Sequence, residues 1–168
     1  EDIEDAVKWV QEHAEELNIN PKSFGFCGQS AGAHLSAASA MTIKGAKAMV
    51  GYAGPYNFLT CNDGVVNTND KKRTSYFHNL DKDVLEAYSP VYMIPKKNIP
   101  ATLLFHGTGD CLVDYTQSEE YAEALRQKGG EVDLRIYPFY DHNLHGQRSD
   151  IGHELLVITA DFFDKHLK

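Results

Sequence analysis

The sequence is organised around Phe24-Gly25-Phe26-Cys27-Gly28-Gln29-Ser30-Ala31-Gly32-Ala33-His34-Leu35, where an apolar strand pattern runs through Gly-x-Ser-x-Gly into a helix-forming run. This pattern predicts a nucleophile elbow, a strand-to-helix turn so tight that Ser30 is held in a strained backbone conformation. We expect glycine at positions 28 and 32 because side chains there would clash. Ser30 Oγ is then exposed at the carboxyl end of the strand, and the backbone amide of Ala31 is the expected donor to an oxyanion.

Length and composition predict one globular domain over residues 1–168. Hydrophobic residues make up 42% of the chain and charged residues 24%, and no apolar run approaches the roughly 18 residues that a membrane span needs. The formal net charge of -8 argues against nucleic acid or an anionic membrane as the main partner, because both need a basic surface. We therefore expect no nucleic-acid or membrane partner, and an uncharged small-molecule substrate.

The cysteines and the first residues indicate little specialised chemistry. The three cysteines, at positions 27, 61 and 111, match no zinc or disulfide spacing, so at least one is a free thiol. Cys27 falls within the apolar strand and is expected to be a small buried core residue. No metal or organic cofactor is implied. The sequence opens on a charged run with no signal peptide in view, which slightly favours a cytoplasmic location.

Helix and strand patterns alternate along most of the chain. Strands are predicted from apolar or alternating runs, and helices from apolar residues three or four positions apart. The expected strands are 23–28, 47–54, 101–106 and 132–138, the last at a sheet edge, and the expected helices are 2–17, 31–42, 116–128 and a closing helix that includes 151–163. This alternation calls for a parallel α/β sheet with right-handed crossovers.

Residues 55–90 interrupt the alternation with a polar connection rich in Asn, Asp and Lys, in which one or two short helices are expected. In an enzyme, a long insertion at this place would be a cap or lid over the site. The alternative is a solvated excursion without a function of its own, and the sequence leaves both interpretations open.

Ser30 needs two partners to act as a nucleophile at neutral pH: a histidine to take its proton and a carboxylate to orient that histidine. Asp110 follows the third predicted strand on a loop with two glycines, and His142 and His145 follow the fourth. Parallel strands place these loops at one edge of the sheet. The resulting chain order of Ser, Asp and His is the order found in α/β-hydrolases.

These motifs together resemble the α/β-hydrolase serine esterases, in the branch of acetyl-xylan esterases and lipase-like carbohydrate esterases. The resemblance covers nearly the whole chain except residues 55–87. Its blocks are Asp5 through Trp9, Asn20-Pro21, Gly28-Gln29-Ser30-Ala31-Gly32, His34-Leu35, Tyr88-Ser89-Pro90-Val91, Pro100 through Asp110 and Gln117-Ser118.

The resemblance assigns roles to individual positions. It implies that Ser30 is the nucleophile, Asp110 the acid of the triad and His142 the general base, with His145 as the fallback. Two further histidines are expected to be structural. His34 lies on the helix after the elbow, and His106 is expected to pack or hydrogen-bond beneath the loop that carries the acid.

The chain departs from the family pattern in two ways. Asp114 stands where the family commonly has proline, which brings a second carboxylate near Asp110. The family's preceding strands, with the His-Gly-Gly loop that donates the second oxyanion amide, are not in this sequence. The expected fold is therefore the C-terminal part of the eight-strand α/β-hydrolase sheet, with about four strands. We expect a second copy of the chain, or another segment, to cover the open edge of the elbow strand.

The expected function is hydrolysis of small carboxylic esters, such as O-acetyl groups on sugars, through an acyl-enzyme on Ser30. Two alternatives share the fold: an arylformamidase-like amidase and a prolyl-oligopeptidase-like peptidase. A third belongs to another class, namely a catalytically impaired fragment or binding module that keeps the motif but lacks half of the sheet.

Overall fold

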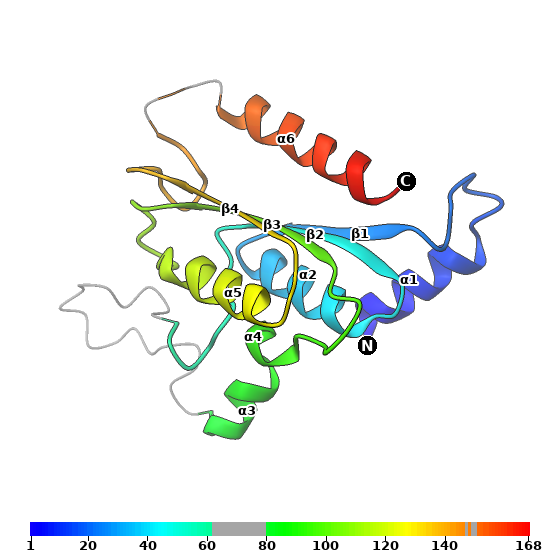
Figure 1. The fold of residues 1–168 in the computed structure, drawn as a ribbon, viewed down its shortest axis with the longest axis horizontal. Coiled ribbons are helices and arrows are strands. Elements are labelled where there is room, and N and C mark those ends of the chain that lie inside the picture. Colours follow the sequence, from blue (N-terminus) through cyan, green and yellow to red (C-terminus); the bar gives the residue numbers. More distant parts are fainter. Residues whose placement is uncertain (62–79, 147, 149–150) are drawn as a thin grey trace.

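The computed structural model describes residues 1–61, 80–146, 148 and 151–168. Its four strands form one parallel sheet in the order β1-β2-β3-β4 (Figure 1), so the predicted parallel α/β sheet of about four strands is confirmed. The elements are α1 (Asp2–Glu12), β1 (Phe24–Gln29), α2 (Ala31–Thr42), β2 (Ala46–Tyr52), α3 (Lys82–Ala87), α4 (Pro90–Met93), β3 (Ala101–Gly107), α5 (Thr116–Gln127), β4 (Val132–Tyr137) and α6 (Ile151–His166).

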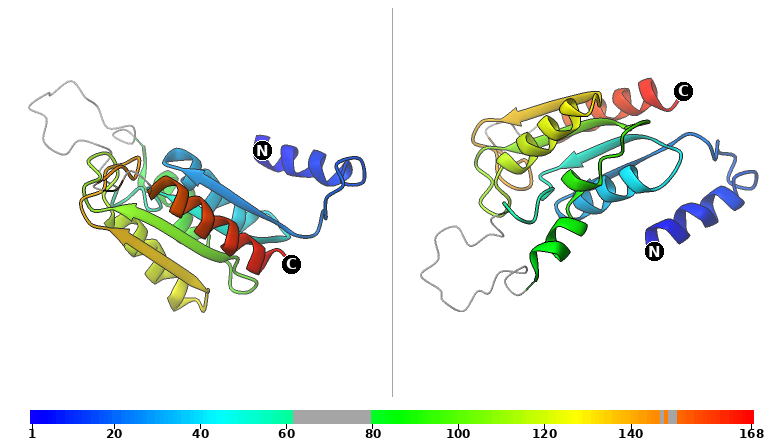
Figure 2. Two further views of the ribbon diagram at one scale, coloured as in Figure 1. Left: turned by 90° about the horizontal axis from the view of Figure 1, so that it is seen from above. Right: turned by 60° about the horizontal axis from the view of Figure 1, so that its bottom comes forward.

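Helices cover both faces of the sheet. Helices α2 and α5 lie on one face and α6 lies on the other (Figures 1 and 2). Within the described part of the chain, no helix has both the length and the apolar character needed to span a bilayer. Because side chains alternate between the two faces of a strand, β2 and β3 contribute to both cores. Met49 and Leu104 are buried on the α2 side, whereas Val50, Leu103 and Phe105 are buried on the α6 side.

The register of the parallel strands aligns their carboxyl ends. Gln29 at the end of β1 pairs with Tyr52 at the end of β2, and Gly107 at the end of β3 pairs with Tyr137 at the end of β4. The loops that follow β1, β3 and β4 therefore emerge at one edge of the sheet, where open α/β sheets place their binding sites.

Helix α1 is shorter than the sequence predicts. The expected helix over residues 2–17 ends at Glu12 and is followed by hydrogen-bonded turns, and Asn18 has a left-handed φ of 53°. Figure 2 shows α1 standing apart from the sheet, and none of its residues is buried. Its apolar side faces a groove of about 420 Å³ that it forms with β1. Among the described strands, none lies beyond β1 to pack against this helix, so its apolar side is only partly covered.

The open edge at β1 also explains why the expectation for Cys27 is wrong. Cys27 is exposed rather than buried. It shares a face of β1 with Gly25, against which Phe163 of α6 packs closely. Helix α6 mainly covers β2 and β3, so it leaves Cys27 uncovered at the rim of the sheet. An apolar strand sequence predicts burial only where neighbours exist on both sides.

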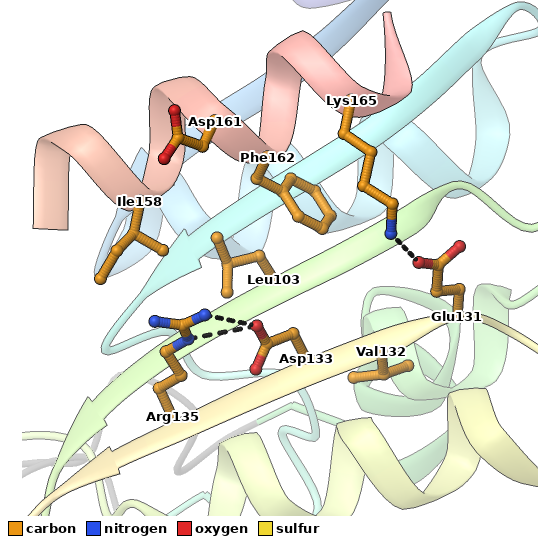
Figure 3. Close-up of a pocket in the computed structure, with 9 residues that line it drawn as sticks. All are labelled: Leu103, Glu131, Val132, Asp133, Arg135, Ile158, Asp161, Phe162 and Lys165. Atoms are coloured by element: carbon orange, nitrogen blue, oxygen red, sulfur yellow. Dashed lines mark hydrogen bonds and ion pairs between the residues drawn. The ribbon is translucent and has the colours of Figure 1, made fainter.

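Strand β4 forms the opposite edge of the sheet, as predicted. A groove of about 390 Å³ separates it from α6 (Figure 3), with Leu103, Ile158 and Phe162 as its apolar part. Its rim carries two ion pairs, Arg135 with Asp133 at 2.9 Å and Lys165 with Glu131 at 2.7 Å. Exposed ion pairs add little stability, but charged side chains at an edge strand discourage pairing with other chains.

In the described part of the polar connection, one short helix, α3, lies within residues 55–90, and α4 begins at its last residue, Pro90. Residues 62–79, which hold most of its Asn, Asp and Lys side chains, lie outside the described residues. The cap-like role of 55–90 therefore stays a prediction.

Candidate active site

The turn between β1 and α2 consists of one residue. Strand β1 ends at Gln29, α2 begins at Ala31, and Ser30 between them has φ 54° and ψ -123°. A positive φ is rare for a residue with a side chain and marks local strain. The amide of Ser30 donates a 2.8 Å hydrogen bond to the carbonyl of Tyr52, which ties the turn to β2. The expected strained strand–turn–helix arrangement is thus present.

The two glycines of the motif differ in whether a side chain at their position would clash with its surroundings. A Cβ at Gly28 would lie 2.3 Å from the carbonyl oxygen of Gly32 and 2.8 Å from Ser36 Oγ, so only glycine fits there. A Cβ at Gly32 would meet nothing within 4 Å. The expectation that both positions avoid a clash is therefore correct at 28 and wrong at 32, because position 28 faces the first turn of α2 whereas position 32 faces open space.

We expect Gly28→Ala to lower the free energy of unfolding by about 1–3 kcal/mol, because the new methyl group meets backbone that must shift. Gly32→Ala is the matched control. It adds the same methyl group within a helix, where alanine is favoured over glycine by up to about 1 kcal/mol. Urea unfolding of the two variants measures the difference, and equal destabilisation would contradict this account of the elbow.

Three side chains from three loops form a hydrogen-bonded row at the carboxyl edge of the sheet. His142 Nε2 lies 2.9 Å from Ser30 Oγ, and His142 Nδ1 lies 2.7 Å from Asp110 Oδ2. Because an ionised carboxylate only accepts, Nδ1 carries the proton and Nε2 is left to accept the hydroxyl hydrogen of Ser30. The Asp110 side chain is fully buried and that of His142 is 12% exposed.

The Asp110 carboxylate is satisfied at both oxygens. Oδ1 accepts from the backbone amides of Leu112 and Val113, each at 2.9 Å, and Oδ2 accepts from His106 Nε2 at 3.1 Å as well as from His142. Burial alone would raise the pKa of Asp110, but these hydrogen bonds outweigh it and lower the pKa from 3.8 to about 2. Asp110 is therefore ionised at neutral pH.

This lowered pKa predicts a loss of stability in acid. The unfolded chain takes up the Asp110 proton near pH 4 and the folded chain only near pH 2, so unfolding binds a proton in this window. The free energy of unfolding is therefore expected to fall as the pH drops from about 4 to about 2. Denaturant unfolding across this range tests the effect. The fall in the free energy of unfolding that comes from Asp110 should be absent in Asp110→Asn and present in Asp114→Asn. Equal slopes of the free energy of unfolding against pH in the two variants would contradict the prediction.

The two alternative site residues point elsewhere. The His145 side chain is 77% exposed, and its Nδ1 lies 3.8 Å from Asp141 Oδ2 rather than beside Ser30. Asp114 Oδ1 accepts from the amide and the hydroxyl of Thr116, at 2.9 and 2.6 Å, at the start of α5. Asp114 therefore holds a helix terminus and does not compete with Asp110 for His142.

Gln29 is a site residue that the sequence analysis missed. Its Nε2 donates to the carbonyl of His142 at 3.2 Å and to Asn143 Oδ1 at 3.3 Å, so the end of β1 holds the loop that carries the histidine. Its position in the sequence could have predicted this role. The residue between Gly28 and Ser30 lies at the same sheet edge as the loops after the other strands.

The two histidines expected to be structural both have hydrogen-bond partners. His34 Nε2 lies 2.8 Å from the carbonyl of Tyr88, and its ring packs against Phe58 at 4.6 Å between centroids, which links α2 to both ends of the polar connection. Burial lowers the pKa of His34, and the hydrogen bond to Tyr88 offsets this only in part. His106 is fully buried beneath Asp110, as expected.

The amide of Ala31 is available for a ligand. As the first residue of α2, Ala31 has no carbonyl within the helix to accept from its N–H, and the residue is exposed. Two later amides of this first turn are used within the helix, because Ala33 and His34 donate to the carbonyl of Ser30 at 3.0 and 3.2 Å. Partial positive charge at this helix terminus favours an anion beside Ser30.

Fold and site together define an α/β-hydrolase with a serine at the elbow. The family model described as BD-FAE matches residues 1–125, and the chain belongs to this family.

Similar proteins carry esterase names. The chain is 26% identical to the probable isoprenylcysteine alpha-carbonyl methylesterase ICMEL1 of Oryza sativa subsp. japonica, over 94% of this chain and 44% of the relative. It is 28% identical to the acetylxylan esterase of Xylanibacter ruminicola, over 95% of this chain and 35% of the relative. The chain thus spans less than half the length of these curated relatives.

A solved structure shows the same fold. The truncated form of a carbohydrate esterase from gut microbiota superposes with a TM-score of 0.80 at 21% identity, over 98% of this chain and 66% of the other. The described strands correspond to a part of the larger α/β-hydrolase sheet, which confirms the expected truncated architecture.

Proposed function

We propose that this chain hydrolyses small carboxylic esters with Ser30 as the nucleophile, His142 as the general base and Asp110 as the residue that orients His142. The observation that carries the proposal is the row of hydrogen bonds from Ser30 Oγ through the imidazole to the buried carboxylate, at 2.9 and 2.7 Å. Each member also meets the chemical demand of its role, since the carboxylate is ionised and the imidazole nitrogen that faces Ser30 is a proton acceptor.

In the first half of the reaction, Ser30 Oγ attacks the ester carbonyl while its proton moves to His142 Nε2. The carbonyl oxygen takes up the negative charge and is stabilised by the Ala31 amide at the α2 terminus. His142 then gives the proton to the departing alcohol as the carbon–oxygen bond of the ester breaks, which leaves an acyl group on Ser30. In the second half, His142 takes a proton from water as the water oxygen attacks the acyl carbon. The bond from that carbon to Ser30 Oγ then breaks, His142 returns the proton to Oγ, and the carboxylic acid leaves.

The finer proposal is that the substrates are O-acetyl esters of sugars. Its support is the similarity to proteins named as acetylxylan esterase and carbohydrate esterase. The net charge of -8 fits a neutral sugar ester better than an anionic substrate. The relative named as a methylesterase also supports ester hydrolysis, but its name indicates an ester of a different alcohol. The alcohol part of the substrate is therefore to be determined by experiment.

The test is an assay of this chain and its Ser30→Ala variant on p-nitrophenyl acetate, acetylated xylose, an aryl formamide and a short peptide. Turnover of the acetyl esters by the parent alone supports the proposal. A preference for the formamide or the peptide would favour the amidase or peptidase alternative, and no Ser30-dependent turnover of any compound would favour a binding module. The assay must detect weak activity, because the Ala31 amide is the one oxyanion donor proposed among the described residues and the loss of one such donor costs about 10²–10³-fold in rate.

We further propose that a second copy of the chain, or another segment, covers the open edge of β1 in the active protein. Strand β1 has unpaired backbone groups along its outer edge, and Ile3, Val7, Val10 and Phe26 line the apolar groove beside it. A sizing experiment on the active preparation tests this, because a fully active species with the mass of one chain would contradict it.

A further inference from the structure

We propose that His106 and Ser118 form a second, buried arm on the Asp110 carboxylate and act as positioning residues that hold it in place for His142. This inference rests on the proposed function, because it assigns a role in the same site. The two side chains come from different elements, His106 from β3 and Ser118 from α5, and both are fully buried.

The hydrogen bonds of this arm have the same order as those from Asp110 through His142 to Ser30. His106 Nε2 lies 3.1 Å from Asp110 Oδ2, the same oxygen that His142 contacts, and His106 Nδ1 lies 2.7 Å from Ser118 Oγ. The carboxylate oxygen is thus held between two imidazoles, and each imidazole has a serine hydroxyl at its far nitrogen. One hydroxyl, that of Ser30, faces the substrate side, and the other is enclosed.

The surroundings of His106 determine where its proton lies. Nε2 faces two acceptors, Asp110 Oδ2 and the carbonyl oxygen of Val113 at 3.0 Å, so Nε2 carries the hydrogen. Nδ1 of the neutral ring then accepts from the hydroxyl of Ser118. The two acceptors at Nε2 therefore select the tautomer of His106 that donates to the carboxylate, and the hydroxyl of Ser118 satisfies the other ring nitrogen.

A positioning role follows from what holds each carboxylate oxygen. Oδ1 is held by two backbone amides of the acid loop, from Leu112 and Val113, which fix the carboxylate to its own loop. Of the described side chains, His106 and His142 are the two that hydrogen-bond to Oδ2. His142 lies on a loop, whereas His106 lies on a central strand, so His106 ties the carboxylate to the rigid part of the fold.

The arm predicts a specific defect when the donor is removed. Without the bond from His106, the buried carboxylate binds a proton more readily, because hydrogen bonds to its charged form are lost. The charged and titratable side chains that contact Asp110 are His106 and His142, and the nearby carboxylate of Asp114 is turned to Thr116. The pKa of the Asp110 carboxyl is therefore expected to rise when the bond from His106 is lost.

The test compares His106→Leu, which fills the space without a donor, with His106→Gln, whose terminal amide can reach the place of Nε2. We expect His106→Leu to lower kcat by about 10- to 100-fold, the scale for a lost hydrogen bond to a charged group, with little change in KM. His106→Gln is expected to recover most of that loss, because its amide again donates to the carboxylate. Equal loss in both variants, or no loss in His106→Leu, would overturn the proposal.

A readout that needs no activity separates this inference from the proposed function. Carbon-13 NMR of labelled aspartate follows the Asp110 carboxyl through a pH titration, and its pKa is expected to rise in His106→Leu but much less in His106→Gln. If the parent is inactive but shows this NMR pattern, the proposed esterase function is rejected and the positioning role of His106 is supported. If the parent is active but lacks the pattern, the esterase function is supported and the positioning role is rejected. Should His106→Leu fail to fold, Ser118→Ala serves in its place, with a smaller rise expected and no rise counting against the arm.

Discussion

Replacing Ser30 with alanine is expected to reduce ester hydrolysis by about 10³-fold or more. Without Oγ no acyl-enzyme can form, and the remaining groups can only bind the substrate and polarise its carbonyl. Stability should change little, because the hydroxyl is partly exposed and its contact with His142 is local. Because alanine keeps Cβ, the backbone strain at φ 54° stays in place when the hydroxyl is removed. Steady-state kinetics together with urea unfolding measures both effects.

The matched control for Ser30→Ala is Cys27→Ala. Cys27 is an exposed potential nucleophile on β1, three residues before the serine, and the ring nitrogens of His142 face Asp110 and Ser30 instead. This variant should keep the parent activity. Activity that survives in Ser30→Ala and disappears in Cys27→Ala would place the nucleophile on the thiol and remove Ser30 from the mechanism.

Replacing His142 with alanine is expected to lower kcat by several orders of magnitude, about as much as the loss of Ser30, because members of such a triad act as one unit. Without the imidazole, none of the bases that the structure describes has a hydrogen bond to Ser30 Oγ, and the Asp110 carboxylate loses one of its four donors. The variant should still bind substrate. Pre-steady-state kinetics on an activated acetyl ester therefore locates the defect in acylation.

His145→Ala is the control for the histidine assignment. His145 lies three positions along the same loop, is 77% exposed and faces Asp141, so its loss should have little effect on kcat. The opposite pattern, a crippled His145→Ala and a mild His142→Ala, would show that the loop rearranges during the reaction and that the base was assigned to the wrong residue.

Much of the fold follows from local sequence patterns, for reasons that particular elements make clear. Strand β3 is fully buried, and its apolar run without alternation predicted a central parallel strand. Helix α2 has the predicted bounds, from Ala31 to Thr42, because the elbow fixes its start. The proximity of Asp110 to the loop that carries His142 and His145 followed from topology, since parallel strands bring their carboxyl ends to one edge, and the family resemblance favoured His142.

The errors arise where tertiary neighbours decide the outcome. Cys27 has the sequence environment of a core residue and is exposed because β1 is an edge strand. Gly32 looks as constrained as Gly28 in the motif, yet only Gly28 faces a crowded turn. The extra partners of the site could not be derived in the same way. The bond from Gln29 to the histidine loop spans 113 positions, and no local pattern predicts such a contact.

The hydrogen bond between His106 and Ser118, which are 12 positions apart, also could not be predicted from local sequence patterns. Both residues were visible in the resembling blocks, but their contact depends on how α5 packs against β3. The sequence predicted a histidine beneath the acid loop, whereas its proton position and its second partner required the three-dimensional arrangement.

The most direct test of Ser30 as the activated nucleophile is covalent labelling with an organophosphate, followed by mass spectrometry of the peptides. The account predicts a single phosphoryl group on the Ser30 peptide of the parent, much slower labelling in His142→Ala, and labelling at the parent rate in His145→Ala. A label on Ser36, Ser39 or a cysteine, or labelling of Ser30 at the same rate without His142, would contradict it.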